Sequence, residues 1–149
     1  MILWLILSTP IVLILLVLLS NQANLTQTPG VMPRLKLFLR TNVAEINLQP
    51  VLPELKSPRF KLSAQELFNR VSTTVESLGW TIEYSDAQKQ SLHAVVTTSL
   101  WKFKDDIKIT AVADGDTSYL QATSGSRVGK GDLAANSHHL QQLLEAVDQ

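Results

Sequence analysis

Apolar and polar residues follow three different patterns along this chain, and each pattern predicts a different kind of element. From Ile2 to Leu19 nearly every residue is apolar and none is charged. As a helix this stretch would measure roughly 27 Å at about 1.5 Å per residue, close to the hydrocarbon thickness of a bilayer. The pattern predicts a transmembrane anchor over residues 1–21. A cleaved secretory signal is the alternative, but no Lys or Arg precedes the apolar run, and Asn21 stands where a small residue is needed for cleavage.

Residues 22–56 show no sustained period and hold four of the six prolines, which indicates an extended connector. Within the connector, residues 31–40 combine leucines and a phenylalanine with Arg34, Lys36 and Arg40. This basic juxtamembrane segment could lie in the lipid interface, form a short strand, or dock on a partner. By the positive-inside rule, the three cations predict that the following domain faces the cytoplasm.

Residues 57–149 carry the signals of a folded domain. Ser63 and Glu66 have the spacing of a capping box, and apolar residues then recur at helical spacing until Gly79. A second helix is expected over residues 133–147, where leucines form one stripe.

Between the two helices the apolar residues recur at every second position. This alternation predicts four strands, with inward-facing residues that include Ile82, Leu92, Ile107 and Leu120. Their short connections, such as the turn at residues 114–116, favour antiparallel pairing. The expected fold is therefore α+β: an N-terminal transmembrane helix, a helix, a four-stranded antiparallel sheet and a C-terminal helix, with both helices on one face of the sheet.

A glycine-rich basic loop joins the last predicted strand to the last helix. Arg127, Gly129, Lys130 and Gly131 could use side-chain charge and backbone amides to hold an anion or lipid headgroup beside a helix N-terminus. A purely structural turn is the favoured interpretation, because most short glycine-rich loops bind nothing.

The other charged residues near this loop are expected to be structural. Asp105 and Asp106 point to opposite faces of one strand, so they cannot share a site, and Asp106 can form a fork with Arg127. Asp132 is predicted to cap the last helix, and Asn136 belongs to the same structural set.

Candidate metal ligands are also weak. His138 and His139 diverge by about 100° on a helix, so they are expected at the surface and no metal site is predicted.

Composition narrows the function further. The 149 residues include thirteen basic and thirteen acidic side chains and no cysteine. Neutral net charge argues against a nucleic-acid partner, and the lack of cysteine excludes disulfides, thiolate catalysis and cysteine-ligated metals. No nucleophile, metal set or cofactor motif accompanies the carboxylates, so an enzyme is not expected and no cofactor is predicted.

Three motifs carry a resemblance to a known family. They are Leu92-His93-Ala94, then Phe103-Lys104-Asp105-Asp106, and finally the run from Ser126 to Leu133 followed by Asn136. In this order they resemble the bacterial and plastid family called domain of unknown function 1499, over residues 57–147. The family often carries an asparagine-cysteine-valine motif upstream of the domain, but residues 50–60 here contain no cysteine. The resemblance implies the fold and frequent membrane association, and no activity.

The leading hypothesis from the sequence is a single-pass membrane protein whose small domain is an accessory or assembly module. Its expected partners are the lipid bilayer and a membrane protein complex. The alternative is a domain that binds an anion or lipid headgroup with the Arg127–Lys130 loop.

Overall fold

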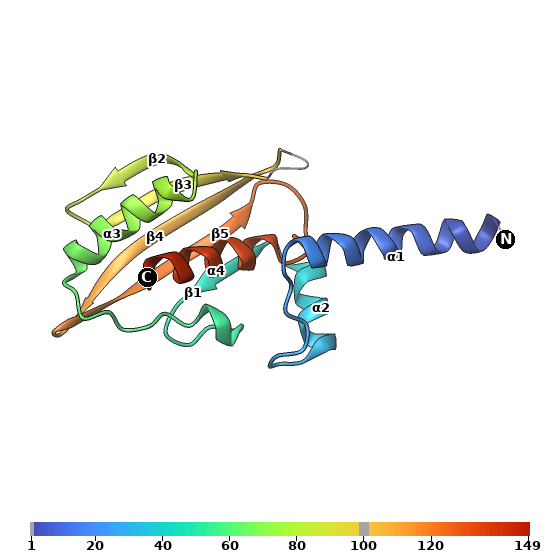
Figure 1. Ribbon diagram of the computed structural model, residues 1–149, viewed down its shortest axis with the longest axis horizontal. Coiled ribbons are helices and arrows are strands. Elements are labelled where there is room, and N and C mark those ends of the chain that lie inside the picture. Colours follow the sequence, from blue (N-terminus) through green and yellow to red (C-terminus); the bar gives the residue numbers. More distant parts are fainter. Residues whose placement is uncertain (1, 99–101) are drawn as a thin grey trace.

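The computed structural model describes the backbone of residues 2–98 and 102–149, and the side chains of residues 9–98 and 102–149. Figure 1 shows a twisted sheet with helices against one face and a single helix that extends away from it. In chain order the elements are α1 (Ile2–Ser20), α2 (Val31–Arg40), β1 (Val43–Ile46), the 3-10 helix η1 (Pro53–Leu55), α3 (Ala64–Ser77), β2 (Thr81–Asp86), β3 (Ser91–Thr97), β4 (Lys104–Asp114), β5 (Thr117–Ser126) and α4 (Ala135–Val147).

The sheet has five strands in the order β1-β5-β4-β3-β2, and all neighbouring strands are antiparallel. Alternate residues of the long β4–β5 hairpin, such as Ile107, Ile109 and Leu120, are buried toward α3 and α4. Lys108 and Gln121 point to the opposite face, which no helix covers in Figure 1. The sheet therefore has one apolar and one largely polar face, as antiparallel sheets commonly do.

The prediction of a four-stranded sheet is wrong, because a fifth strand comes from the expected connector. Residues of β1 pair with β5, with Val43 opposite Gly125 and Ile46 opposite Ala122. β1 has only four residues, too few for alternation to stand out between the prolines of the connector. Its place in the sheet comes from pairing with a strand almost eighty positions away, which local pattern does not encode.

The transmembrane anchor predicted for residues 1–21 is also wrong: among the described residues, no helix is long and apolar enough to cross a membrane. The end of α1 belongs to the domain instead. Leu18 is 3% exposed and lies in the main hydrophobic core. The side-chain amide of Asn21 donates a 2.9 Å hydrogen bond to the carbonyl of Leu133. Part of the apolar run is thus apolar because it packs on the protein itself.

The basic segment of the connector forms α2, and its first cation is not at a surface. Arg34 is fully buried, and its guanidinium forms a fork with Glu54, with N–O distances of 2.6 and 2.7 Å. The same guanidinium donates to the carbonyls of Asn24, Gln27 and Thr28. Arg34 therefore closes the loop before α2 onto η1.

Removing this guanidinium should destabilise the fold strongly. We expect Arg34→Met to lower the free energy of unfolding by about 3–5 kcal/mol, because Glu54 and three carbonyls lose their buried donor. Arg40→Met, at the exposed end of the same helix, should change it by less than about 0.5 kcal/mol. Urea unfolding followed by circular dichroism measures both. Equal stabilities of the two variants would show that Arg34 does not hold this region together.

Candidate functional site

The glycine-rich loop and the start of α4 are held by one buried side chain, Asn136. Its Nδ2 lies 2.7 Å from Asp132 Oδ2 and 2.9 Å from both the carbonyl of Asn42 and Ser126 Oγ, and donates to these oxygens. Its Oδ1 accepts a 2.6 Å hydrogen bond from Ser124 Oγ. Asn136 is fully buried. One amide therefore connects the residue before β1 with β5, the loop and α4, which assigns it a structural role.

Asp132 occupies the position beside the helix N-terminus at which anion binding was considered. Its Oδ1 accepts from the backbone N–H of Ala134 and its Oδ2 from that of Asn136, each at 3.0 Å. The prediction that Asp132 is the N-cap is wrong, because α4 begins at Ala135, two residues later than expected, and its N-cap residue is Ala134. Asp132 still accepts from one amide of the first turn, that of Asn136. Burial raises the pKa of this carboxyl above its ordinary value, partly offset by the bonds from Asn136. An incoming anion would meet a carboxylate already bound to these donors, so the geometry disfavours anion binding here.

The glycines of the loop serve backbone geometry. A side chain at Gly131 would bring its Cβ within 2.4 Å of the carbonyl oxygen of Leu39, so only glycine lets the loop lie against the end of α2. Gly129 has φ +97°, in the region that favours glycine. Lys130 between them is exposed. The structure does not place Gly129, Lys130 or Gly131 beside Asp106, the residue that binds Arg127.

Arg127 instead belongs to a charged cluster on the uncovered face of the sheet. Its Nε and Nη2 donate to the two oxygens of Asp106 at 2.8 and 2.6 Å. His93 Nε2 lies 2.9 Å from Asp106 Oδ1, and Glu83 lies 3.7 Å from Arg127 and 3.9 Å from His93 Nδ1. A bulge between Ile82 and Tyr84 places Glu83 beside the other three residues.

This cluster has the residue types of a metal site but not the arrangement. Ligand atoms of Glu83, His93 and Asp106 all lie within 4.8 Å of one another. However, the two carboxylates approach opposite nitrogens of the imidazole, and the Asp106 oxygens already bind Arg127. One ion cannot take both imidazole nitrogens, so the geometry favours a cross-strand ion-pair network.

Asp105 faces the other side of β4 and meets His139. His139 Nε2 lies 3.1 Å from Asp105 Oδ2, and both residues are buried. The expectation that His139 is a surface residue is therefore wrong, whereas His138 is partly exposed. The ring of Trp80 meets His139 edge-on, with centroids 6.2 Å apart. His139 Nδ1 has no hydrogen-bond partner in the described part of the chain.

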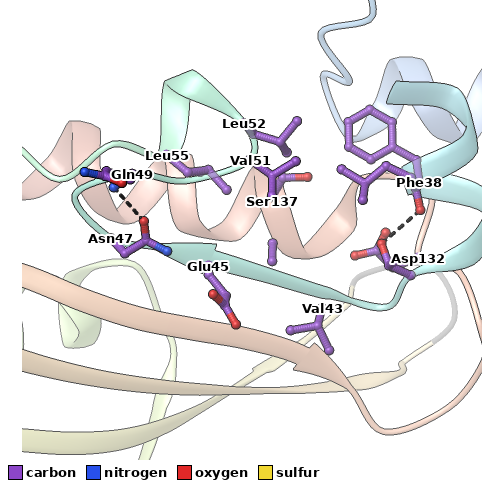
Figure 2. A pocket seen from close by; sticks show the side chains of 13 residues that line it. Phe38, Val43, Glu45, Asn47, Gln49, Val51, Leu52, Leu55, Asp132 and Ser137 are labelled. Atoms are coloured by element: carbon purple, nitrogen blue, oxygen red, sulfur yellow. Dashed lines mark hydrogen bonds between the residues drawn. The ribbon is translucent and has the colours of Figure 1, made fainter. Parts of the chain in front are cut away.

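A cleft with a mainly apolar lining lies at the β1 edge of the sheet and was not expected from the sequence. This cleft, of about 400 Å³, lies between β1, the C-terminal half of α2, the chain around η1 and the start of α4 (Figure 2). Phe38, Leu52 and Leu55 form its apolar walls, and Glu45 and Asp132 are its acidic residues. The walls come from separate segments without a shared motif, so no sequence signal could have assembled them.

These features define a small α+β domain whose charged loop is bound into the fold by its own side chains. The chain belongs to the family described as Protein of unknown function (DUF1499), whose model matches residues 24–147. The match begins well before residue 57, where the resemblance was expected to start, and so includes α2, β1 and η1. No curated protein matches the chain.

The fork between Arg127 and Asp106 should be visible in a titration. Bonding from Arg127, helped by His93, outweighs burial and lowers the pKa of Asp106 from 3.8 to about 2. The ionised carboxylate of Asp106 therefore stabilises the fold fully above about pH 4, and this stabilisation is lost as the pH falls toward 2. In Arg127→Leu the pKa of Asp106 should rise toward 3.8, while Lys108→Leu on the same strand should leave it unchanged. Carboxyl carbon NMR shifts measure both variants, and an unchanged value in Arg127→Leu would rule out the fork.

Proposed function

We propose that the protein is a non-enzymatic accessory module that α1 holds against the apolar surface of a membrane protein complex. The observation that carries this proposal is the surface of α1. The described part of the helix has six apolar side chains that are each at least half exposed: Ile11, Val12, Leu13, Leu15, Leu16 and Leu19. Soluble proteins rarely leave so large an apolar surface uncovered unless it is an interaction site.

The distribution of these side chains favours apolar surroundings over a one-sided groove. Residues 11–13 are consecutive, and consecutive helical residues point about 100° apart, so they cover more than one face of the helix. A helix that is apolar all round is stable where apolar groups surround it. The packed apolar helices of a membrane protein complex provide such surroundings. α1 also projects away from the domain (Figure 1), and only its C-terminal end, at Leu18, packs in the core.

The non-enzymatic part of the proposal rests on how the charged groups of the domain are used. Arg127 and Asp106 bind each other, Asp132 binds backbone amides, and Arg34 binds Glu54. Each of these groups already has a structural partner, so none is presented to a substrate. The Arg127–Lys130 loop gains no support as an anion site, since Asp132 takes the amides beside it.

Native purification of the tagged full-length protein tests the accessory role. Membranes are solubilised in mild detergent, and the co-purifying proteins are identified by mass spectrometry. We expect a stoichiometric membrane protein partner with the wild type. The double variant Leu13→Asp/Leu16→Asp should lose it, because two carboxylates would enter the apolar contact. Tyr84→Asp, which changes an exposed ring on β2, should retain it.

Two results would contradict the proposal. One is a wild-type protein that purifies alone as a single monodisperse species, including the case in which it associates only with lipid vesicles. The other is a partner that the double α1 variant binds as well as the wild type does.

A further inference from the structure

The outer edge of β1 has free hydrogen-bonding groups. The N–H of Ser126 donates to the carbonyl of Asn42, so the antiparallel alternation turns the backbone groups of Ala44 and Ile46 toward β5. The N–H and C=O groups of Val43 and Glu45 therefore point outward. Within the described part of the chain, no hydrogen bond satisfies these outward groups.

The same edge already has a hydrogen-bond partner at its next outward-facing residue, Asn47. The carbonyl of Asn47 points outward like those of Val43 and Glu45, and it accepts a 2.9 Å hydrogen bond from the N–H of Ser57. The protein thus already adds its own extended chain to this edge, but only at the far end. An added strand could continue the sheet at Val43 and Glu45, because an unpaired edge is open to pairing with another chain.

The apolar cleft lies directly beside this open stretch of edge. Val43, Ala44 and Glu45 line it, and its walls include Phe38 from α2 and Leu52 beside η1 (Figure 2). Side chains of an added strand would alternate between the two faces of the sheet. Those on the helix side would enter the cleft, and those on the other side would lie next to Glu45.

The charges around the cleft define the partner further. Glu45 and Asp132 line it, and no Lys, Arg or His does so among the described residues. Glu45 is exposed at the edge and forms no ion pair among the described residues. A basic side chain on the added strand would therefore gain an opposite charge at the cross-strand position.

We propose that β1 and its cleft form a docking site for an extended peptide segment in which apolar residues alternate with basic ones, bound as a sixth strand. Main-chain bonds to Val43 and Glu45 hold the segment, the cleft takes an apolar side chain, and Glu45 selects a basic one. Strand addition with pockets for alternate side chains is an established mode of peptide recognition. The site lies on the domain and does not depend on α1, so this proposal can be tested independently of the accessory role.

Fluorescence anisotropy with synthetic peptides tests this site on the full-length protein in mild detergent. The probe is a fluorescein-labelled octapeptide in which leucine alternates with lysine. A second peptide has the same residues in two blocks, and a third has the alternating sequence with every backbone amide N-methylated. We expect binding of the alternating peptide only, because the block peptide loses the two-faced pattern and the methylated peptide loses the main-chain donors.

Three variants locate the binding. Val43→Pro removes one outward N–H while leaving the bonds to β5, since proline is tolerated where an edge N–H faces solvent. Glu45→Lys reverses the charge at an exposed position. Each should weaken binding by about tenfold or more. Glu76→Lys makes the same charge change on the exposed side of α3 and should have no effect. Circular dichroism checks that each variant is folded.

Several results would overturn the proposal. One is the absence of binding to the alternating peptide at millimolar concentration. Another is equal binding of the block or methylated peptide, which would indicate charge attraction or an apolar ligand in the cleft instead of strand addition. A third is unchanged affinity of Val43→Pro. A β1-mediated dimer, seen by sedimentation and dissociated by Val43→Pro, would assign the edge to a second copy.

Discussion

The buried amide of Asn136 is the contact on which the arrangement of this end of the domain depends. β1 is four residues long and pairs with one strand only, and the loop before α4 contains two glycines that give it little stiffness of its own. The Asn136 side chain binds the residue before β1, a serine of β5, the last residue of β5 and the loop carboxylate Asp132. Inside a protein such bonds are strong, and each broken one leaves a costly unpaired group. The open edge and the cleft exist because this amide fixes their neighbours.

Charged groups and apolar groups therefore have different roles in this structure. The conspicuous charges of the sequence face inward or bind each other: Arg34 closes the loop before α2, and Arg127 joins β5 to β4. Apolar side chains, in contrast, stand uncovered along α1, and main-chain groups stand unpaired at β1. An apolar helix and a strand edge are therefore two surfaces that the described part of the chain leaves open to other molecules. Both suit protein partners better than a small charged substrate, and this is why an accessory role fits the molecule.

Local signals in the sequence were reliable where local physics decides the structure. The capping box of Ser63 and Glu66 is confirmed, and so is the turn at Gly115 between two long alternating strands. Features that depend on contacts between distant parts of the chain could not be predicted from the sequence. The apolar run of residues 2–19 has the composition of a membrane helix, yet Leu18 packs in the core and the described chain has no helix able to span a membrane. Arg34 and His139 look like surface residues until Glu54 and Asp105 are placed beside them. The cleft requires three distant segments to meet.

The measurement that tests the central role of Asn136 most directly is amide hydrogen exchange in Asn136→Ala. The account predicts that protection falls together in β1, the loop at residues 127–134 and the first turn of α4, while β2 and β3 keep theirs. The free energy of unfolding should drop by about 3 kcal/mol, from several buried groups left unpaired. Asn69→Ala, an exposed residue of α3, serves as the matched control. Unchanged protection in β1 and the loop would contradict the account, because these segments would then be held by something other than this amide.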